Sequence, residues 1–143
     1  MRVNLLIFLL LSLLLDCSRC QMISQCSDLL GIQNNLLASY FLTNSFDCSQ
    51  TTLSPIGNAS CPFRGVFNGQ GFTISNVTIN SATNNTALFS FGCGATVSNM
   101  IFDNFNVRGQ MNTALLFGNA TSVKIMNVTL TSSTGTSSVF GAG

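Results

Sequence analysis

The sequence contains very few charged residues. Of its 143 residues, five are Lys or Arg and four are Asp or Glu, which gives a formal net charge of +1. Proteins that bind nucleic acid or anionic lipid use clusters of basic residues, and a composition this poor in charge supports neither kind of partner. We therefore expect no nucleic-acid binding, and no membrane contact beyond an N-terminal signal.

Histidine and tryptophan are absent. A serine nucleophile of the triad type needs a histidine base, and zinc sites are built from His and Cys at short spacings. No Cys-x-x-Cys pair follows the N-terminal twenty residues. We therefore expect no metal, no cofactor and no catalytic residue.

Apolar and uncharged polar residues make up most of the chain. Hydrophobic residues account for 46% of it, which is enough for one domain with a core. Segments rich in Val, Ile, Phe and Thr alternate with clusters of Gly, Asn and Ser, a pattern typical of strands joined by turns. After residue 45 no pattern indicates a helix, so we expect an all-β fold.

The segments also repeat. Three segments align so that an asparagine and its apolar neighbours occupy the same positions: Thr73–Ile79, Thr96–Phe102 and Val123–Leu130. Their asparagines are Asn76, Asn99 and Asn127, which lie 23 and 28 residues apart. A second set comprises 87–92, 114–118 and 139–141. A period in the twenties predicts a solenoid, in which each coil buries its apolar face against its neighbours.

Stacked coils would place like residues over like. The candidate interior residues are Phe63, Val66 or Phe67, Phe72, Ile74, Val77 and Ile79. Glycines are expected where the backbone turns sharply or where a side chain would clash, and the candidates are Gly65, Gly69 and Gly71. We expect Asn76, Asn99 and Asn127 to form one structural ladder, with their amides bonded to each other and to the turns.

The N-terminal twenty residues have the pattern of a secretory signal. Arg2 precedes an apolar run from Leu5 to Leu15, and Ser18 and Cys20 supply small residues before a cleavage point at Gln21. The run is short for a bilayer-spanning helix, which needs about 20 apolar residues. An uncleaved anchor and a lipoprotein acylated at Cys17 are the alternatives. We expect a secreted or cell-surface protein.

Residues 21–39 are expected to cap the solenoid. Apolar residues recur at roughly helical spacing between Ile23 and Ala38, and Ser24 or Ser27 offers an N-cap. Such a helix would cover the apolar floor of the first coil. Residues 40–143 would then form the repeats. They stop within a repeat, so we expect either an open last coil available for self-association or part of a longer array.

Four cysteines follow the signal: Cys26, Cys48, Cys61 and Cys93. An even number in a secreted chain indicates two disulfides, and three pairings are possible. Our choice is Cys26–Cys48 and Cys61–Cys93.

Five Asn-x-Ser/Thr sequons are potential glycosylation sites in a secreted eukaryotic protein. Asn58, Asn84 and Asn119 lie in polar linkers, and we expect glycans there. Asn76 and Asn127 belong to the repeating corner, where a laddered amide leaves no place for a sugar.

The residue order resembles a known family. The chain resembles secreted right-handed parallel β-helix proteins with GLUG-type repeats. The resemblance lies in the block Phe63-x-Gly65-x-Phe67-x-Gly69-x-Gly71-x-x-Ile74 and in residues 40–44, 55–57, 87–89 and 94–99. These include filamentous-haemagglutinin-like adhesins, the N-terminal regions of some immunoglobulin A proteases, and surface proteins of protists. The resemblance covers residues 22–143. Its usual Gly-Leu-Phe-Gly is replaced here by 87–92 and 115–118, and its acidic triplet by 45–47.

The resemblance implies an adhesin-like module that binds carbohydrate or protein without chemical change. Two alternatives remain. A structural coat component would self-assemble through the last coil. A polysaccharide lyase or hydrolase would need clustered carboxylates. After the signal the chain has only Asp28, Asp47 and Asp103, far apart in sequence, so we expect no enzyme activity. Arg64, Arg108 and Lys124 are expected on the surface, and the two arginines could contact a ligand if they share a face.

Overall fold

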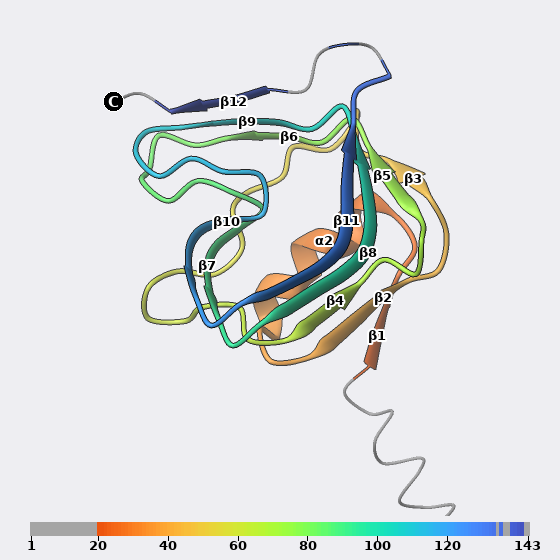
Figure 1. Ribbon diagram of the computed structural model, residues 1–143, viewed down its shortest axis with the longest axis horizontal. Helices are drawn as coiled ribbons and strands as arrows, with labels where there is room; N and C mark the ends of the chain where they lie inside the picture. The colour runs from red at the N-terminus through yellow and green to blue at the C-terminus, as the bar shows by residue number, and fades with distance from the viewer. Residues whose placement is uncertain (1–19, 134, 136–137, 142–143) are drawn as a thin grey trace, which may run out of the picture.

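The chain forms a parallel β-solenoid of about three turns with one short helix, seen along its axis in Figure 1. The computed structural model describes residues 20–133, 135 and 138–141, so most of the predicted signal lies outside the described residues. Every strand pairing in this part of the chain is parallel. The all-β parallel β-helix predicted from the repeats is confirmed.

The described elements follow one another with short connections. In chain order they are β1 (Cys20–Ile23), α2 (Cys26–Gly31), the 3-10 helix η2 (Ile32–Asn34), β2 (Ser39–Leu42), β3 (Phe46–Asp47), β4 (Val66–Asn68), β5 (Thr73–Ser75), β6 (Thr78–Asn80), β7 (Phe89–Cys93), β8 (Thr96–Asp103), β9 (Asn106–Gly109), β10 (Phe117–Thr121), β11 (Lys124–Thr131) and β12 (Ser138–Gly141).

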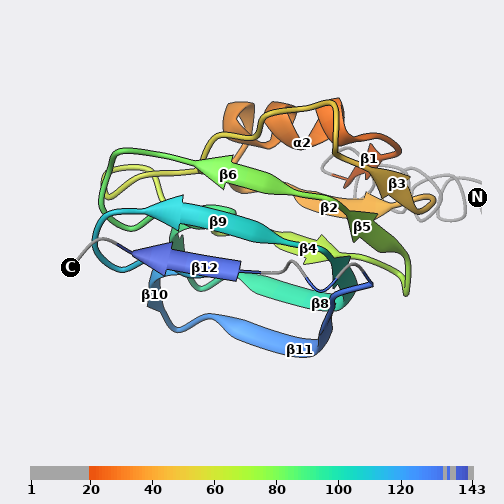
Figure 2. The ribbon, with the colours of Figure 1, turned by 90° about the horizontal axis from the view of Figure 1, so that it is seen from above.

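Each strand pairs with a strand of the neighbouring coil. β8 is long and bent: its first half pairs with β4, and its second half pairs with β5. β11 follows the same bend beside β8 (Figure 1). β6, β9 and β12 form a second sheet, and β7 and β10 form a third. The coil is therefore a polygon whose sides are short sheets that run along the solenoid axis (Figure 2).

The register shows that one coil takes 28 residues over most of the solenoid. Ile74 lies beside Phe102, Phe89 beside Phe117, and Val97 beside Ile125. The predicted alignment of Thr73–Ile79 with Thr96–Phe102 is therefore wrong, because Thr73 lies beside Ile101, whereas Thr96 lies beside Val66. The third member of the second repeat set is also misplaced, since Val139 pairs with Val107 on β9.

Corners with a left-handed backbone explain the misleading match. Asn76 and Asn104 have φ of 56° and 54° at one corner, and Asn99 and Asn127 have φ of 53° and 51° at another. Asparagine tolerates this conformation better than most residues. Asn76 and Asn99 each follow an apolar residue and a serine, so one local pattern occurs twice within about one coil.

Gly69 and Gly71 occupy positions of the kind predicted from the sequence. A Cβ at Gly69 would collide with Met100 and with the carbonyl oxygen of Asn99, so the tight approach of two coils requires glycine there. Gly71 has φ of 83°, which favours glycine in the following turn.

The N-terminal segment covers one end of the solenoid (Figure 2). The predicted helix from Ile23 to Ala38 is shorter than expected, because Ile23 ends strand β1 and α2 begins at Cys26. The N-cap is Gln25 and not Ser24 or Ser27. The Asp28 carboxylate accepts hydrogen bonds from the backbone N–H groups of Ser24 (2.9 Å) and Gln25 (3.2 Å), which satisfies donors that the helix leaves open.

A disulfide fixes this cap to the first coil. Cys26 at the start of α2 is bonded to Cys48 after β3, with 5.3 Å between the Cα atoms, as predicted. Closing a loop of 22 residues stabilises a fold by about 3 kcal/mol in the chain-entropy description.

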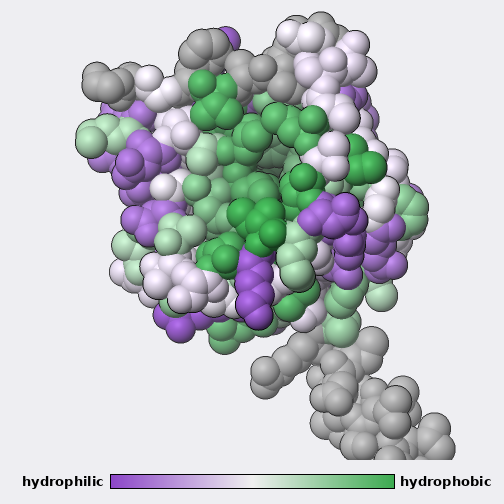
Figure 3. Space-filling model, in the orientation of Figure 1, coloured by the Kyte–Doolittle hydropathy of each residue, from purple (hydrophilic) through white to green (hydrophobic). Residues whose placement is uncertain are grey.

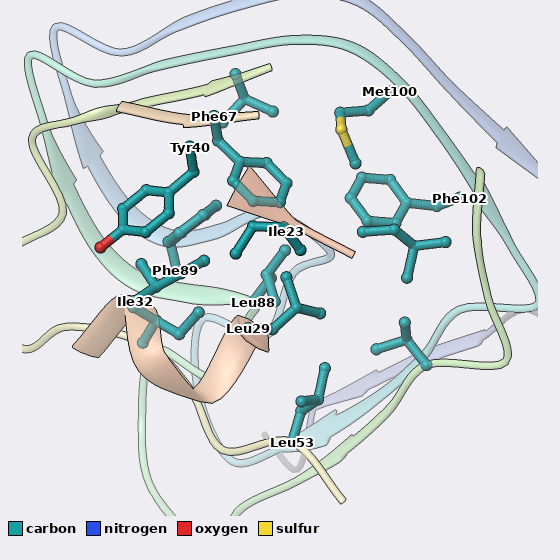
Figure 4. Packing of buried hydrophobic residues seen from close by; sticks show 14 of the residues in the cluster. Ile23, Leu29, Ile32, Tyr40, Leu53, Phe67, Leu88, Phe89, Met100 and Phe102 are labelled. Atoms are coloured by element: carbon teal, nitrogen blue, oxygen red, sulfur yellow. The ribbon is translucent and has the colours of Figure 1, made fainter. Parts of the chain in front are cut away.

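Stacked aromatic rings fill the interior. Phe89 lies 4.3 Å from Phe63, 5.8 Å from Phe67 and 5.2 Å from Phe117, measured between ring centroids. Leu29 and Ile32 of the cap point into the same cluster (Figure 4). The predicted interior residues Phe63, Phe67, Ile74, Val77 and Ile79 are all buried, whereas Val66 and Phe72 are half-buried.

This stack yields a stability prediction. Replacing Phe89, which is fully buried, with alanine should lower the free energy of unfolding by about 3–5 kcal/mol, because it removes three ring contacts and leaves a cavity. Phe91→Ala, on the same strand but half-buried, should cost about 1 kcal/mol. Urea unfolding followed by circular dichroism measures both variants, and equal losses would contradict the interior stack.

Candidate functional site

A shallow groove runs along one corner of the solenoid. It is lined by Phe41, Asn68, Gln70, Gly71, Asn99 and Asn127. Phe41 pairs with Asn68 in the strand register, and Asn99 and Asn127 follow on the next two coils. The four stacked strands β2, β4, β8 and β11, at a spacing of about 4.8 Å, give a groove roughly 14 Å long.

Three asparagine side chains form a ladder along the floor of this groove. Asn127 Nδ2 donates to Asn99 Oδ1 at 3.0 Å, and Asn99 Nδ2 donates to Asn68 Oδ1 at 3.2 Å. Asn68 Oδ1 also accepts from the backbone N–H of Gln70 at 2.9 Å. An amide nitrogen carries two hydrogens, so Asn99 and Asn127 each use one in the ladder and keep one for a ligand.

The predicted ladder of Asn76, Asn99 and Asn127 is therefore only partly right. Asn99 and Asn127 are stacked, but their third member is Asn68. Asn76 belongs to a second row at the other corner, where its Nδ2 donates to Asp47 and its Oδ1 accepts from Asn104 Nδ2 at 3.1 Å. The error follows from the alignment of two corners of one coil.

The chemistry of the groove is polar and uncharged. All six lining residues are neutral: three ladder amides and the Gln70 side chain offer donors and acceptors, and Phe41 contributes a half-buried ring. Such a surface suits a ligand with many hydroxyl groups and an apolar face, and it gives no attraction to an ionic group.

Sequence reasoning missed Phe41, Asn68 and Gln70 as members of this site. In the sequence, Phe41 has no feature beyond its place at the start of the repeats, and Asn68 lies two residues before the turn at Gln70. The signal that identifies them is the register between coils, since Phe41, Asn68 and Ser98 are lateral neighbours.

The structure brings Asp47 and Asp103 into one column, although they are far apart in sequence. Asp47 pairs with Ser75, and Ser75 pairs with Asp103. Two strand spacings separate the aspartates, about 9.6 Å. This backbone separation approaches the distance between the two carboxyl groups of inverting glycosidases.

Hydrogen bonds, however, hold both groups in the charged form. The hydroxyl of Ser49 lowers the pKa of Asp47 most. The backbone N–H of Ser49, whose nitrogen lies 2.7 Å from Oδ1, and the amide of Asn76 lower it further. Ser133 lowers the pKa of Asp103, and Thr131 contributes a further bond of 2.9 Å. A glycosidase pair needs one carboxyl group with a raised pKa to donate a proton, and these two are shifted in the opposite direction.

The arginines do not share a face. Arg64 lies in the turn before β4, beside the groove formed by Gln33, Leu37 and Cys61, whereas Arg108 lies on β9. Both side chains are exposed, as expected. Lys124 is also exposed, at the start of β11.

The second predicted disulfide is not formed. Phe63 lies opposite Gly92, and the backbone N–H of Cys93 donates to Phe63 O, so Cys93 lies beyond Phe63 while Cys61 precedes it by two residues. The two cysteines are therefore offset along the coil, and both thiols are free. No group of three or more metal-ligating side chains occurs among the described residues.

The five sequons differ in how their amides are used. Asn58, Asn84 and Asn119 are exposed. Asn76 and Asn127 donate their Nδ2 atoms, to which a glycan would be attached, to Asp47 and Asn99. Glycosylation at the first three stays a prediction.

Among the described residues, no helix has the length and apolar character needed to span a bilayer. Comparisons with protein-family models, curated proteins and solved structures gave no match.

Asn99 is the central residue of the ladder, and its replacement tests the ladder. Asn99→Ala removes two side-chain hydrogen bonds worth about 1 kcal/mol each and forces a left-handed alanine at a cost of about 1 kcal/mol, so we expect a loss near 3 kcal/mol. Asn99→Gly should lose about 1 kcal/mol less, because glycine adopts φ of 53° freely. Chemical unfolding compares them, and an unchanged midpoint in Asn99→Ala would refute the ladder.

The aspartates predict sensitivity to acid. Asp28 is held below its ordinary pKa of 3.8, chiefly by the backbone N–H of Ser24, and Asp47 and Asp103 are lowered likewise. The unfolded chain then binds protons at higher pH than the folded chain, so this stability is complete above about pH 5 and is lost as the pH falls below about 4. Thermal unfolding at pH 7 and pH 3 measures it, and Asp28→Asn should show a smaller decrease in Tm.

Proposed function

We propose that this chain is a non-enzymatic binding module of the adhesin type, secreted or held at a cell surface, whose groove along the Asn68–Asn99–Asn127 ladder binds an extended neutral carbohydrate. The observation that carries the proposal is the groove itself, a neutral surface that combines one aromatic ring with a regular row of amides on a rigid scaffold.

The shape of the groove favours an extended ligand. The floor repeats at the strand spacing, about 4.8 Å, because each ladder amide belongs to a different coil. A chain of pyranose rings has a repeat of comparable length and presents hydroxyl groups in each unit. Successive sugars can therefore meet successive amides, each of which keeps at least one donor hydrogen outside the ladder.

Phe41 provides an anchor at one end of the groove. An aromatic ring packs against the C–H face of a sugar and excludes water around the neighbouring hydrogen bonds. The ring lies directly beside Asn68 in the register, so stacking and hydrogen bonding converge on the same unit.

The family resemblance and the Cys26–Cys48 disulfide support an adhesin-like role outside the cytoplasm. GLUG-type repeat proteins include adhesins, and a disulfide is typical of an oxidising, extracytoplasmic environment. The predicted signal and the exposed sequons agree with that environment. The lowered pKa values of Asp47 and Asp103 favour binding over hydrolysis.

Binding to a glycan array tests the proposal. The chain, secreted from a eukaryotic host, should be retained on neutral polysaccharides, and Phe41→Ala should weaken retention about tenfold, equivalent to about 1.4 kcal/mol. Phe46→Ala is the matched control, because Phe46 is also half-buried but lies at β3, outside the groove.

Two results would contradict the proposal. Equal retention of Phe41→Ala and the parent chain would place binding elsewhere. Release of shortened sugars, detected by mass spectrometry and abolished by Asp103→Asn, would establish an enzyme.

A further inference from the structure

The two ends of the solenoid differ sharply. Ile125, Leu130 and Val139 on the last coil are 53%, 45% and 41% exposed. Their neighbours one coil earlier, Val97, Phe102 and Val107, are at most 3% exposed. Within the described part of the chain, no further coil covers these residues of the interior type.

Ile125 and Leu130 also line a hollow at this end of the solenoid. It has a volume of about 680 Å³, and its lining includes Phe102, Phe105, Leu115, Leu116, Phe117 and Ile125. Figure 3 shows the hollow as a continuous hydrophobic area in the centre of this face, with hydrophilic residues around it. An apolar hollow with a polar rim marks an interaction surface.

The last coil also presents open strand edges. β11 has eight residues and pairs with β8 on one side only, within the described part of the chain. An exposed edge of this length readily pairs with another strand. A suitable partner must supply both an apolar surface for the hollow and a strand for the edge of β11.

We infer that a second copy of this chain covers the last coil, so that two solenoids join end to end about a two-fold axis. The last coil of a second copy carries the same apolar residues and the same open edge, and a two-fold contact matches a surface to itself. Stacking in the head-to-tail direction is obstructed, because α2 lies over the other end (Figure 2).

The charge on the last coil is compatible with antiparallel pairing of the β11 strands of two copies. Lys124 is the one charged residue in the sequence from Phe117 to Thr131. It stands at the first position of β11, so antiparallel pairing of two β11 strands places the two lysines at opposite ends of the pair. Repulsion between them is then small in water.

This association would also extend the groove, a consequence that rests on the proposed function. Asn127 is the last amide of the ladder, and no described residue donates to its Oδ1 atom. The partner copy would bring its own Asn127 to the junction. The joined groove would contain six amides, with a Phe41 ring near each outer end.

Sedimentation velocity of the secreted chain, without ligand, tests the association. We expect a monomer–dimer equilibrium over micromolar concentrations and no larger species. The double variant Ile125→Lys with Leu130→Lys should raise the dissociation constant of the dimer at least about a hundredfold, because each copy then brings two charges into the apolar contact. Leu37→Lys is the matched control, since Leu37 is 67% exposed and lies at the capped end.

Circular dichroism establishes that the variants retain their β-structure; since both residues are already half-exposed, folding should survive. A second pair, Ile125→Ser with Leu130→Ser, serves if the lysines disturb the fold. A monomer at all concentrations, as expected if further polypeptide or a different protein covers this end, would overturn the inference. So would oligomers beyond the dimer, or a dimer unaffected by both pairs. A dimer that binds no glycan would refute the proposed function alone.

Discussion

Parallel hydrogen bonding between successive coils is the constraint on which the rest of this structure depends. It places a residue directly over the one about 28 positions earlier, so each side chain is selected mainly by its neighbour one coil away. Apolar residues gather inside, residues that tolerate positive φ occupy the corners, and neutral polar residues remain on the surface. Low charge follows from the same constraint, because identical charges stacked at the strand spacing would repel one another.

The sequence predicted the solenoid, most of its interior and the existence of a cap, because these depend on local patterns. It did not predict the register. Ile74-Ser75-Asn76-Val77 and Val97-Ser98-Asn99-Met100 look like copies, yet they turn two different corners. Both consist of a short strand, a left-handed asparagine and an inward apolar residue, since any corner of a tight coil imposes these requirements. Only pairing between coils distinguishes the two.

The candidate site was hidden for the same reason. Phe41 and Asn68 are ordinary strand residues in sequence, and they become part of a groove only because pairing aligns them with Asn99 and Asn127. Asp47 and Asp103 likewise share a column that no local pattern reveals. The predicted Cys61–Cys93 bond assumed neighbouring positions, and the actual register offsets them. The Cys26–Cys48 bond was predictable because it ties a terminal segment to the coil that it covers.

The cap and the open last coil give the groove an uneven stability. At the capped end, α2, the disulfide and the aromatic stack hold β2 and Phe41 in place. At the other end, β11 pairs on one side within the described chain, and its apolar side chains are half-exposed, so local opening costs least there. Asn127 belongs to this weakly held strand. A partner that covers the last coil would therefore also order the far end of the groove. A ligand bound along the ladder would favour that covering in return, because both equilibria involve β11.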